Sequence, residues 1–219
     1  AGNLNSTSTQ TIVIDTTYPT ISFATPYTVT GNYTLSYIEA NISVTDTNLK
    51  NITINVYNSD GSLNQSNTST TSPFYWNYTN LADGIYYLNA TTYDNAGNVN
   101  STATQTIVLD TIIPIVSLFS PPNNTLEIVS GLVTFVYNVT DTTSQINNCS
   151  IYLNDILTET DNSITKDSYQ TFTRTLSNGQ YNWTIGCYDY VSNTANSSIY
   201  NLSIDVSAPT TKLNPPVDS

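Results

Sequence analysis

Hydrophobic and polar residues alternate along many short stretches of this chain. In IEANISV, residues 38–44, every second residue is apolar, and VTFVYNV, residues 133–139, has the same pattern. A period of two residues is typical of a strand with one buried face, and no stretch shows the sustained 3,4 spacing of an amphipathic helix. The pattern predicts strands near residues 20–25, 35–45, 51–57, 73–79, 85–93 and 103–109, and again near 115–119, 132–140, 148–153, 169–175, 181–188 and 198–204. We therefore expect an all-β protein.

The sequence also repeats itself at a spacing of 95 residues. AGNLNSTSTQTIVIDTTYP, which opens the chain, returns as AGNVNSTATQTIVLDTIIP from residue 96, and a weaker copy, SNTANSSIYNLSIDVSAP, ends at Pro209. Matching positions include Asp15, Asp110 and Asp205. A fixed period of this length indicates tandem duplication of one module. About six short strands per period favour an immunoglobulin-like sandwich, with Val133, Phe135, Tyr137 and Val139 facing its core.

The composition limits the partners that this chain can have. Of its 219 residues, 38% are hydrophobic and only 9% are charged, with a net charge of −12. This is enough apolar surface for two domain cores. The negative charge and the lack of basic clusters argue against nucleic acid, and no apolar run approaches the roughly 18 residues of a membrane helix. We expect neither nucleic-acid binding nor membrane insertion within this span.

Several motifs resemble known extracellular repeats. LADGIYY and LSNGQYN both read L-x-x-G-x-Y, which resembles the tyrosine corner of immunoglobulin-like and fibronectin-like domains. The DTxxP linker and the YDNAGN turn are similar to the bacterial-type Ig-like repeats of surface adhesins. SPPNNT…VTFVYNVTD and NNCSIYLND…YNWTIGCYD look like the versions found in archaeal surface proteins. This resemblance covers nearly the whole chain and implies a cell-surface stalk, layer or filament, most closely of the archaeal kind.

The period sets the expected domain boundaries. We expect two complete Ig-like domains at residues 16–110 and 111–205, preceded by the last strand of another repeat at 1–15 and followed by the start of a further one at 206–219. Ile12 and Ile14 then need a neighbouring sheet, because a lone strand cannot satisfy its backbone or bury its apolar side. That sheet belongs either to an adjacent repeat of the same polypeptide or to an identical subunit that receives residues 8–15 as a donated strand.

Cys149 and Cys187 are the only cysteines. In an Ig-like sandwich they fall on neighbouring strands with inward parity, which predicts a disulfide rather than two buried thiols. A disulfide indicates an oxidising, extracellular setting. The matching positions of the first repeat are Ile52 and Thr92, so that copy is expected to rely on packing alone.

The chain is rich in Asn-X-Ser/Thr sequons, which are acceptors for N-linked glycans. In the strands these asparagines alternate with core residues, so their side chains are expected to face solvent, either carrying glycans or simply as outward polar residues. Covalent glycans would protect a weakly charged surface from aggregation. The fifteen candidate sites are Asn5, Asn32, Asn41, Asn51, Asn64, Asn67, Asn77, Asn89, Asn100, Asn123, Asn138, Asn148, Asn182, Asn196 and Asn201.

Two sets of aspartates recur at the same places in the repeat. Sandwich topology brings Asp15, Asp46 and Asp94 to one end of the first domain, and Asp110, Asp141 and Asp189 to the same end of the second. Three carboxylates with loop carbonyls suit Ca²⁺, which takes six to eight oxygen ligands, and calcium there would stiffen the junctions. The alternative is that each aspartate only makes an Asx-turn before the proline.

Catalysis has little support in the sequence, because there is no histidine and the three glutamates are scattered. We predict no catalytic residues and no enzyme activity. The first hypothesis is a structural one, a glycosylated run of Ig-like repeats in a surface stalk or filament. The second is a binding module for a glycan or a partner cell, and the third is a head-to-tail polymer built through residues 8–15.

Overall fold

The structure is a computed structural model that describes residues 2–12, 14–127 and 129–208. The described chain consists of strands and loops with no helix, which confirms the predicted all-β class. Its contacts divide it into two units, with Leu35–Leu109 forming the bulk of the first and Asp110–Ser219 the bulk of the second. The part of the expected further repeat from residue 209 onward lies outside the described residues.

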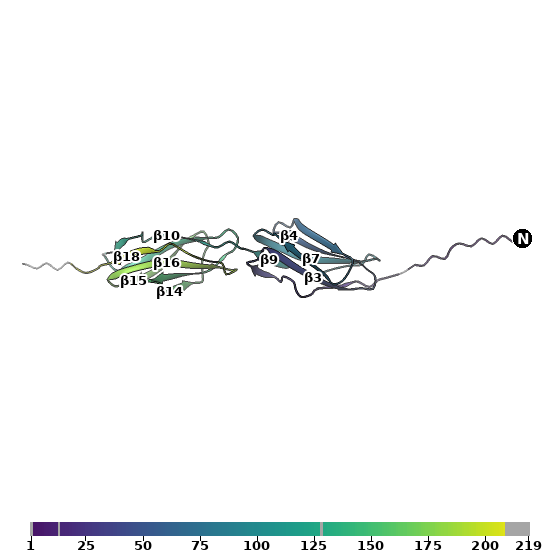
Figure 1. The fold of residues 1–219 in the computed structure, drawn as a ribbon, viewed down its shortest axis with the longest axis horizontal. Helices are drawn as coiled ribbons and strands as arrows, with labels where there is room; N and C mark the ends of the chain where they lie inside the picture. Colours follow the sequence, from purple (N-terminus) through teal and green to yellow (C-terminus); the bar gives the residue numbers. More distant parts are fainter. Residues whose placement is uncertain (1, 13, 128, 209–219) are drawn as a thin grey trace, which may run out of the picture. The chain divides into compact units, whose positions relative to one another are not determined.

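The first unit is a two-layer sandwich (Figure 1). One layer has the strand order β1-β3-β6, and the other has the order β2-β9-β7-β4-β5, with β8 added beside β7. The strands are β1 (Thr20–Phe23), β2 (Gly31–Tyr33), β3 (Tyr37–Thr45), β4 (Leu49–Asn58), β5 (Leu63–Ser69), β6 (Phe74–Thr79), β7 (Gly84–Asp94), β8 (Val99–Ser101) and β9 (Gln105–Leu109).

The second unit repeats this topology strand for strand. Its layers have the orders β10-β12-β15 and β11-β18-β16-β13-β14, with β17 beside β16. The strands are β10 (Ile115–Ser120), β11 (Thr125–Glu127), β12 (Leu132–Thr140), β13 (Ile146–Leu153), β14 (Ile156–Asp161), β15 (Tyr169–Thr175), β16 (Gly179–Asp189), β17 (Thr194–Asn196) and β18 (Tyr200–Ile204). The duplication seen in the sequence is therefore a duplication of the fold.

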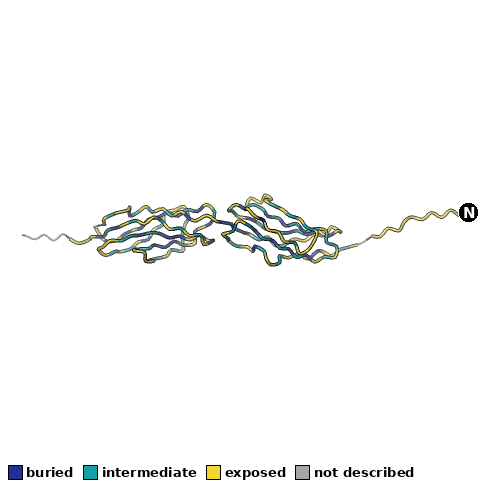
Figure 2. Tube along the Cα trace, viewed as in Figure 1, coloured by how far each residue is buried: buried dark blue, intermediate teal, exposed yellow. Residues whose placement is uncertain are grey.

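Alternation builds each core as expected. In β3, Ile38, Ala40 and Ile42 are completely buried, while the residues between them are only partly covered. Figure 2 shows this alternation of buried and partly covered positions along the strands. In the second unit, Phe135 packs edge-on against Trp183 across the two layers, with ring centroids 5.0 Å apart. Apolar side chains on both layers thus close each sandwich.

The L-x-x-G-x-Y motif makes the same contact in both units. Tyr86 donates its hydroxyl hydrogen to the carbonyl of Ala82 at 2.9 Å, and Tyr181 does so to Ser177 at 3.0 Å. Each tyrosine reaches a carbonyl four residues upstream, which is the hydrogen bond of a tyrosine corner. The role of this motif is structural, as predicted.

Residues 2–12 and 14–18 form no strand. Ile12 and Ile14 are 83% and 85% exposed, although the matching Ile107 and Leu109 of β9 are completely buried. The segment is exposed along nearly its whole length in Figure 2. The same sequence pattern is therefore a strand where it has a partner edge and an extended segment where it has none.

Candidate functional site

The best-defined polar arrangement is the anchor that holds each DTxxP linker to its own repeat. In the first repeat, the side-chain amide of Asn98 donates to the carbonyls of Asp15 and Thr17, at 3.1 and 3.2 Å. In the second repeat, Asn193 donates to the carbonyls of Asp110 and Ile112, at 3.2 and 2.9 Å. We call these contacts the linker anchor. They fix the linker against the turn that follows β7 or β16.

The anchoring asparagine is itself held by an aspartate of the same turn. Asp94 accepts hydrogen bonds from the Asn98 backbone and side chain at 2.8 and 2.7 Å. Asp189 accepts the matching pair from Asn193, both at 2.9 Å. The role of Asn98 and Asn193 was not predicted from the sequence, although their 95-residue spacing was a signal that could have found them.

The other repeated aspartates shape the linker and the loop beside it. The Asp15 Oδ1 atom accepts the Thr17 amide at 3.0 Å, and Asp110 Oδ1 accepts the Ile112 amide at the same distance. Asp141 Oδ1 accepts the amides of Thr143 and Ser144, both at 2.8 Å. These are Asx-turn contacts. The Asx-turn interpretation of the aspartates therefore accounts for the Oδ1 atom of each carboxylate and not for the Oδ2 atom.

The second repeat brings its three carboxylates into one buried cluster. Oxygen atoms of Asp110, Asp141 and Asp189 all lie within 4.8 Å of one another, and the residues are 0%, 8% and 1% exposed. Burial raises the pKa of Asp189 above its ordinary value, and the nearby charge of Asp110 raises it further, against the hydrogen bonds from Asn193 and Val191. We call these three residues the acidic cluster.

The aspartates at the matching positions of the first repeat are arranged differently. Among the residues that the structure describes, Asp15, Asp46 and Asp94 do not bring an oxygen each within that distance. The side-chain amide of Asn48 donates to Asp15 Oδ2 at 2.7 Å, and this bond, with that of Thr17, lowers the pKa of Asp15. In the first repeat an amide therefore satisfies the acceptor oxygen that faces the loop.

Cys149 and Cys187 are bonded to each other in the second unit. They are direct partners on the adjacent strands β13 and β16 of one layer, where the first unit pairs Ile52 with Thr92. The bond closes a loop with a sequence separation of 38 residues. It joins two strands of the same sheet, unlike the bond between sheets in antibody domains.

None of the fifteen sequon asparagines is buried. Eight are exposed, and they are Asn5, Asn32, Asn64, Asn77, Asn100, Asn123, Asn196 and Asn201. Seven are half-buried, and they are Asn41, Asn51, Asn67, Asn89, Asn138, Asn148 and Asn182. Among the half-buried ones, the side-chain oxygens of Asn41, Asn51, Asn89 and Asn138 are covered and have no hydrogen-bond partner. The expected outward parity thus holds fully for Asn77 and Asn201 and only in part for the half-buried strand positions.

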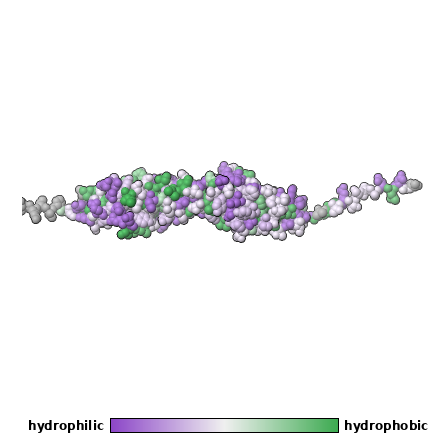
Figure 3. All heavy atoms as spheres, viewed as in Figure 1, coloured by the Kyte–Doolittle hydropathy of each residue, from purple (hydrophilic) through white to green (hydrophobic). Residues whose placement is uncertain are grey.

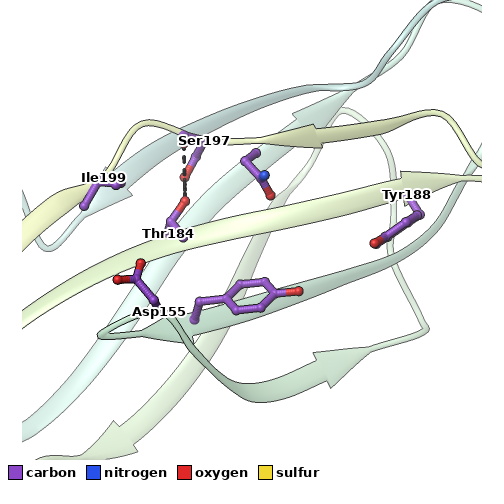
Figure 4. Close-up of a pocket in the computed structure, with 7 residues that line it drawn as sticks. Asp155, Thr184, Tyr188, Ser197 and Ile199 are labelled. Atoms are coloured by element: carbon purple, nitrogen blue, oxygen red, sulfur yellow. Dashed lines mark hydrogen bonds between the residues drawn. The ribbon is translucent and has the colours of Figure 1, made fainter.

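A shallow groove of about 440 Å³ lies on the surface of the second unit. Tyr152 and Tyr188 line it together with Asp155, and Figure 4 shows Thr184 hydrogen-bonded to Ser197 at its edge, at 3.0 Å between the hydroxyl oxygens. Asp155 is the single carboxylate among the residues that line the groove, and no histidine accompanies it. The groove offers stacking and hydrogen bonding rather than an acid and base pair.

Comparison with known families gives one match. Residues 70–156, which run from the middle of the first unit into the second, match the sequence model of the bacterial Ig-like domain (group 3). This part of the chain is similar to bacterial Ig-like domains. A search of curated proteins found no match. Ig-like domains typically serve as structural modules. The described part of the chain contains no helix suited to crossing a membrane.

Solved structures of several other proteins resemble this chain at low sequence identity. Fibronectin(III)-like modules of Clostridium thermocellum CbhA are 17% identical with a TM-score of 0.42, over 90% of this chain and 100% of theirs. The BSP domain structure of a biofilm associated protein is 17% identical with a TM-score of 0.31, over 84% of this chain and 30% of that one. Latent PorU of Porphyromonas gingivalis is 14% identical with a TM-score of 0.34, over 88% of this chain and 21% of that one.

Proposed function

We propose that this chain is an extracellular structural repeat region of a glycosylated cell-surface stalk or filament protein, of the archaeal kind. The observation that carries the proposal is the linker anchor. Asn98 and Asn193 bind the linker of their own repeat through the same pair of carbonyl positions. A junction that is copied with its domain is what a spacer needs, because every added repeat then meets the chain in the same way.

The chemistry of the surface supports an extracellular location. The disulfide is typical of an oxidising compartment. Only 9% of the residues are charged, and Figure 3 shows a surface that is mostly weakly polar, with hydrophobic patches. A coat of covalent N-glycans would keep such a surface from associating with itself. We expect glycans first at the eight exposed sequons, where the attachment nitrogen can be reached.

Glycosylation is testable by mass spectrometry of peptides from the native protein. Exposed Asn77 and Asn123 are expected to be occupied, and half-buried Asn89 and Asn138 serve as internal controls in the same digest. Unmodified asparagines at all eight exposed sequons would remove glycosylation from the proposal. Occupancy that ignored exposure would show that the acceptors are modified before the domains fold.

The stalk proposal is tested by deleting one whole period, residues 111–205, from the complete protein in its own cells. A spacer predicts shorter surface projections with unchanged attachment of the cells to their partners. Loss of attachment with normal display at the surface would instead favour the binding module, and the Tyr152 and Tyr188 groove would be the place to look for its ligand. Deleting residues 16–110 is the matched control, since that period lacks the groove residues.

The exposed N-terminal segment supports a second proposal, that residues 8–15 complete the sheet of another Ig-like repeat. Ile12 and Ile14 match β9 residues that are completely buried, so they carry the apolar face of a last strand. If the partner sheet belongs to an identical subunit, the purified chain should associate in sedimentation experiments, and I12D/I14D should abolish this. A monomeric chain at all concentrations would leave an adjacent repeat of the same polypeptide as the partner.

A further inference from the structure

We infer that the second repeat binds one Ca²⁺ ion through Asp110, Asp141 and Asp189, and that the first repeat does not. The inference starts from three buried carboxylates that have no ion-pair partner among the described residues. Each is more than nine-tenths buried, and their oxygens approach within 4.8 Å. Like charges this close inside a domain repel each other strongly unless a cation or a proton neutralises them.

Two oxygens of the cluster have no hydrogen-bond donor. Asp110 Oδ2 and Asp141 Oδ2 are fully covered and unpartnered, while the Oδ1 atom of each is held by backbone amides. One oxygen therefore fixes the carboxylate and leaves the other free to bind. The hydroxyl of Ser144, a residue that is 4% exposed and lies next to Asp141 in the same loop, is also buried without a partner. An uncompensated buried oxygen is costly, so two such oxygens in one acidic cluster favour a bound cation.

No lysine or arginine of the described residues forms an ion pair with the acidic cluster. The Lys166 ammonium donates to the backbone carbonyl of Ser144 at 3.0 Å and not to a carboxylate. The single ion pair found among the described residues joins Arg174 to Glu159. Within the described chain, the carboxylates thus have no ion-pair partner.

The donor set selects calcium. Ca²⁺ binds oxygens at about 2.3–2.6 Å, so two of its ligands are separated by at most about 5 Å, which agrees with the spacing of the cluster. All candidate ligands are carboxylate or hydroxyl oxygens, which suit Ca²⁺ and Mg²⁺ rather than the transition metals. Mg²⁺ demands near-octahedral geometry and usually keeps several waters, and a buried, irregular loop site therefore favours Ca²⁺.

The first repeat lacks the site for a specific reason. Backbone hydrogen bonds show that Asn48 and Gln145 occupy equivalent places, since Asn95 donates to the Asn48 carbonyl and Tyr190 to that of Gln145. The Asn48 amide fills the acceptor of Asp15 at 2.7 Å, whereas Gln145 is exposed and leaves Asp110 Oδ2 unpartnered. The loop after Asp141 is two residues longer than the loop after Asp46. In the second repeat it therefore supplies no amide to the aspartate of the linker, and Asp110 Oδ2 stays without a donor.

Isothermal titration of the whole chain with CaCl₂, after removal of metals by a chelator, tests the inference. We expect one Ca²⁺ per chain and a higher melting temperature of the second unit with calcium, but little effect of MgCl₂ at the same concentration. D110N keeps the Oδ1 acceptor for the Ile112 amide and removes the charge, so it should weaken binding by about 10–100-fold or more. D15N, at the equivalent position of the first repeat, should bind as the wild type does.

The possible outcomes separate the inference from its alternatives. Absence of binding by the wild type would overturn it and leave a shared proton as the neutralising group. Two ions per chain, or equal losses in D15N and D110N, would overturn the difference between the repeats. Thermal melting of D110N in the presence of a chelator shows whether this variant folds. If D110N does not fold, D141N provides a second variant. Weakening by D141N with native-like melting in chelator would support the site, and unchanged binding would refute it.

Discussion

Removing the disulfide should destabilise the second unit alone. The bond closes a loop with a separation of 38 residues, and in the chain-entropy treatment a loop of this length contributes about 4 kcal/mol to stability. For a domain of about 100 residues, a loss of this size lowers the melting temperature by about 15–30 °C. The first unit pairs Ile52 with Thr92 at the same place and should not respond.

Differential scanning calorimetry of C149A/C187A is the direct assay. The wild type should show two transitions, and the variant should shift one of them downward by the expected amount. Because the cysteines are fully buried, the alanines also remove packing atoms. The wild type in the presence of a reductant keeps the sulfur atoms, so the shift common to both experiments reports the cross-link.

Transfer of the bond to the first unit provides the matched control. I52C/T92C places cysteines on direct partners in β4 and β7, and the oxidised variant should raise the other transition. The reasoning fails if both transitions fall together in C149A/C187A. It also fails if neither moves by more than a few degrees.

Three further predictions concern single side chains. N193A should destabilise the second unit by about 1–3 kcal/mol in chemical denaturation, because two linker carbonyls and Asp189 lose a donor, and N98A should do the same to the first. Y78F should cost about 1 kcal/mol, since the Tyr78 hydroxyl donates to a buried carbonyl, whereas Y137F should be neutral or stabilising, since the Tyr137 hydroxyl has no partner. Burial raises the pKa of both tyrosines above the ordinary 10.0. The stability that they contribute is therefore complete below pH 10 and falls as the pH rises further. In a titration followed by tyrosinate absorbance, their ionisation should coincide with unfolding.

Long strands with one buried face could be predicted from the sequence, and most of their ends agree with the structure to within two residues. The strands that were missed lack that signal. β5 and β14 lie at sheet edges and are largely polar and exposed, so they show no buried apolar face. β2, β8, β11 and β17 have three residues each, too few for a period to be seen. Edge and very short strands are defined by their partners rather than by their own residues.

The candidate site was predictable in position and not in detail. Sandwich topology alone indicated that Asp110, Asp141 and Asp189 lie at one end of the second domain, and their carboxylates do meet there. The difference between the repeats depends on whether a side-chain amide reaches Asp15 or leaves Asp110 open. Whether the amide contacts the aspartate depends on the conformation of the loop after Asp46 or Asp141. The pattern of residues does not predict that conformation.

The linker anchor has a consequence for how such proteins change over generations. Because Asn98 and Asn193 each hold the linker that enters their own domain, one period of DNA encodes a domain together with its junction. Unequal recombination between periods can then insert or remove whole units without creating a new contact that selection must improve. The anchor makes the number of repeats a freely adjustable trait, so related proteins can differ in their number of domains while using the same folded part.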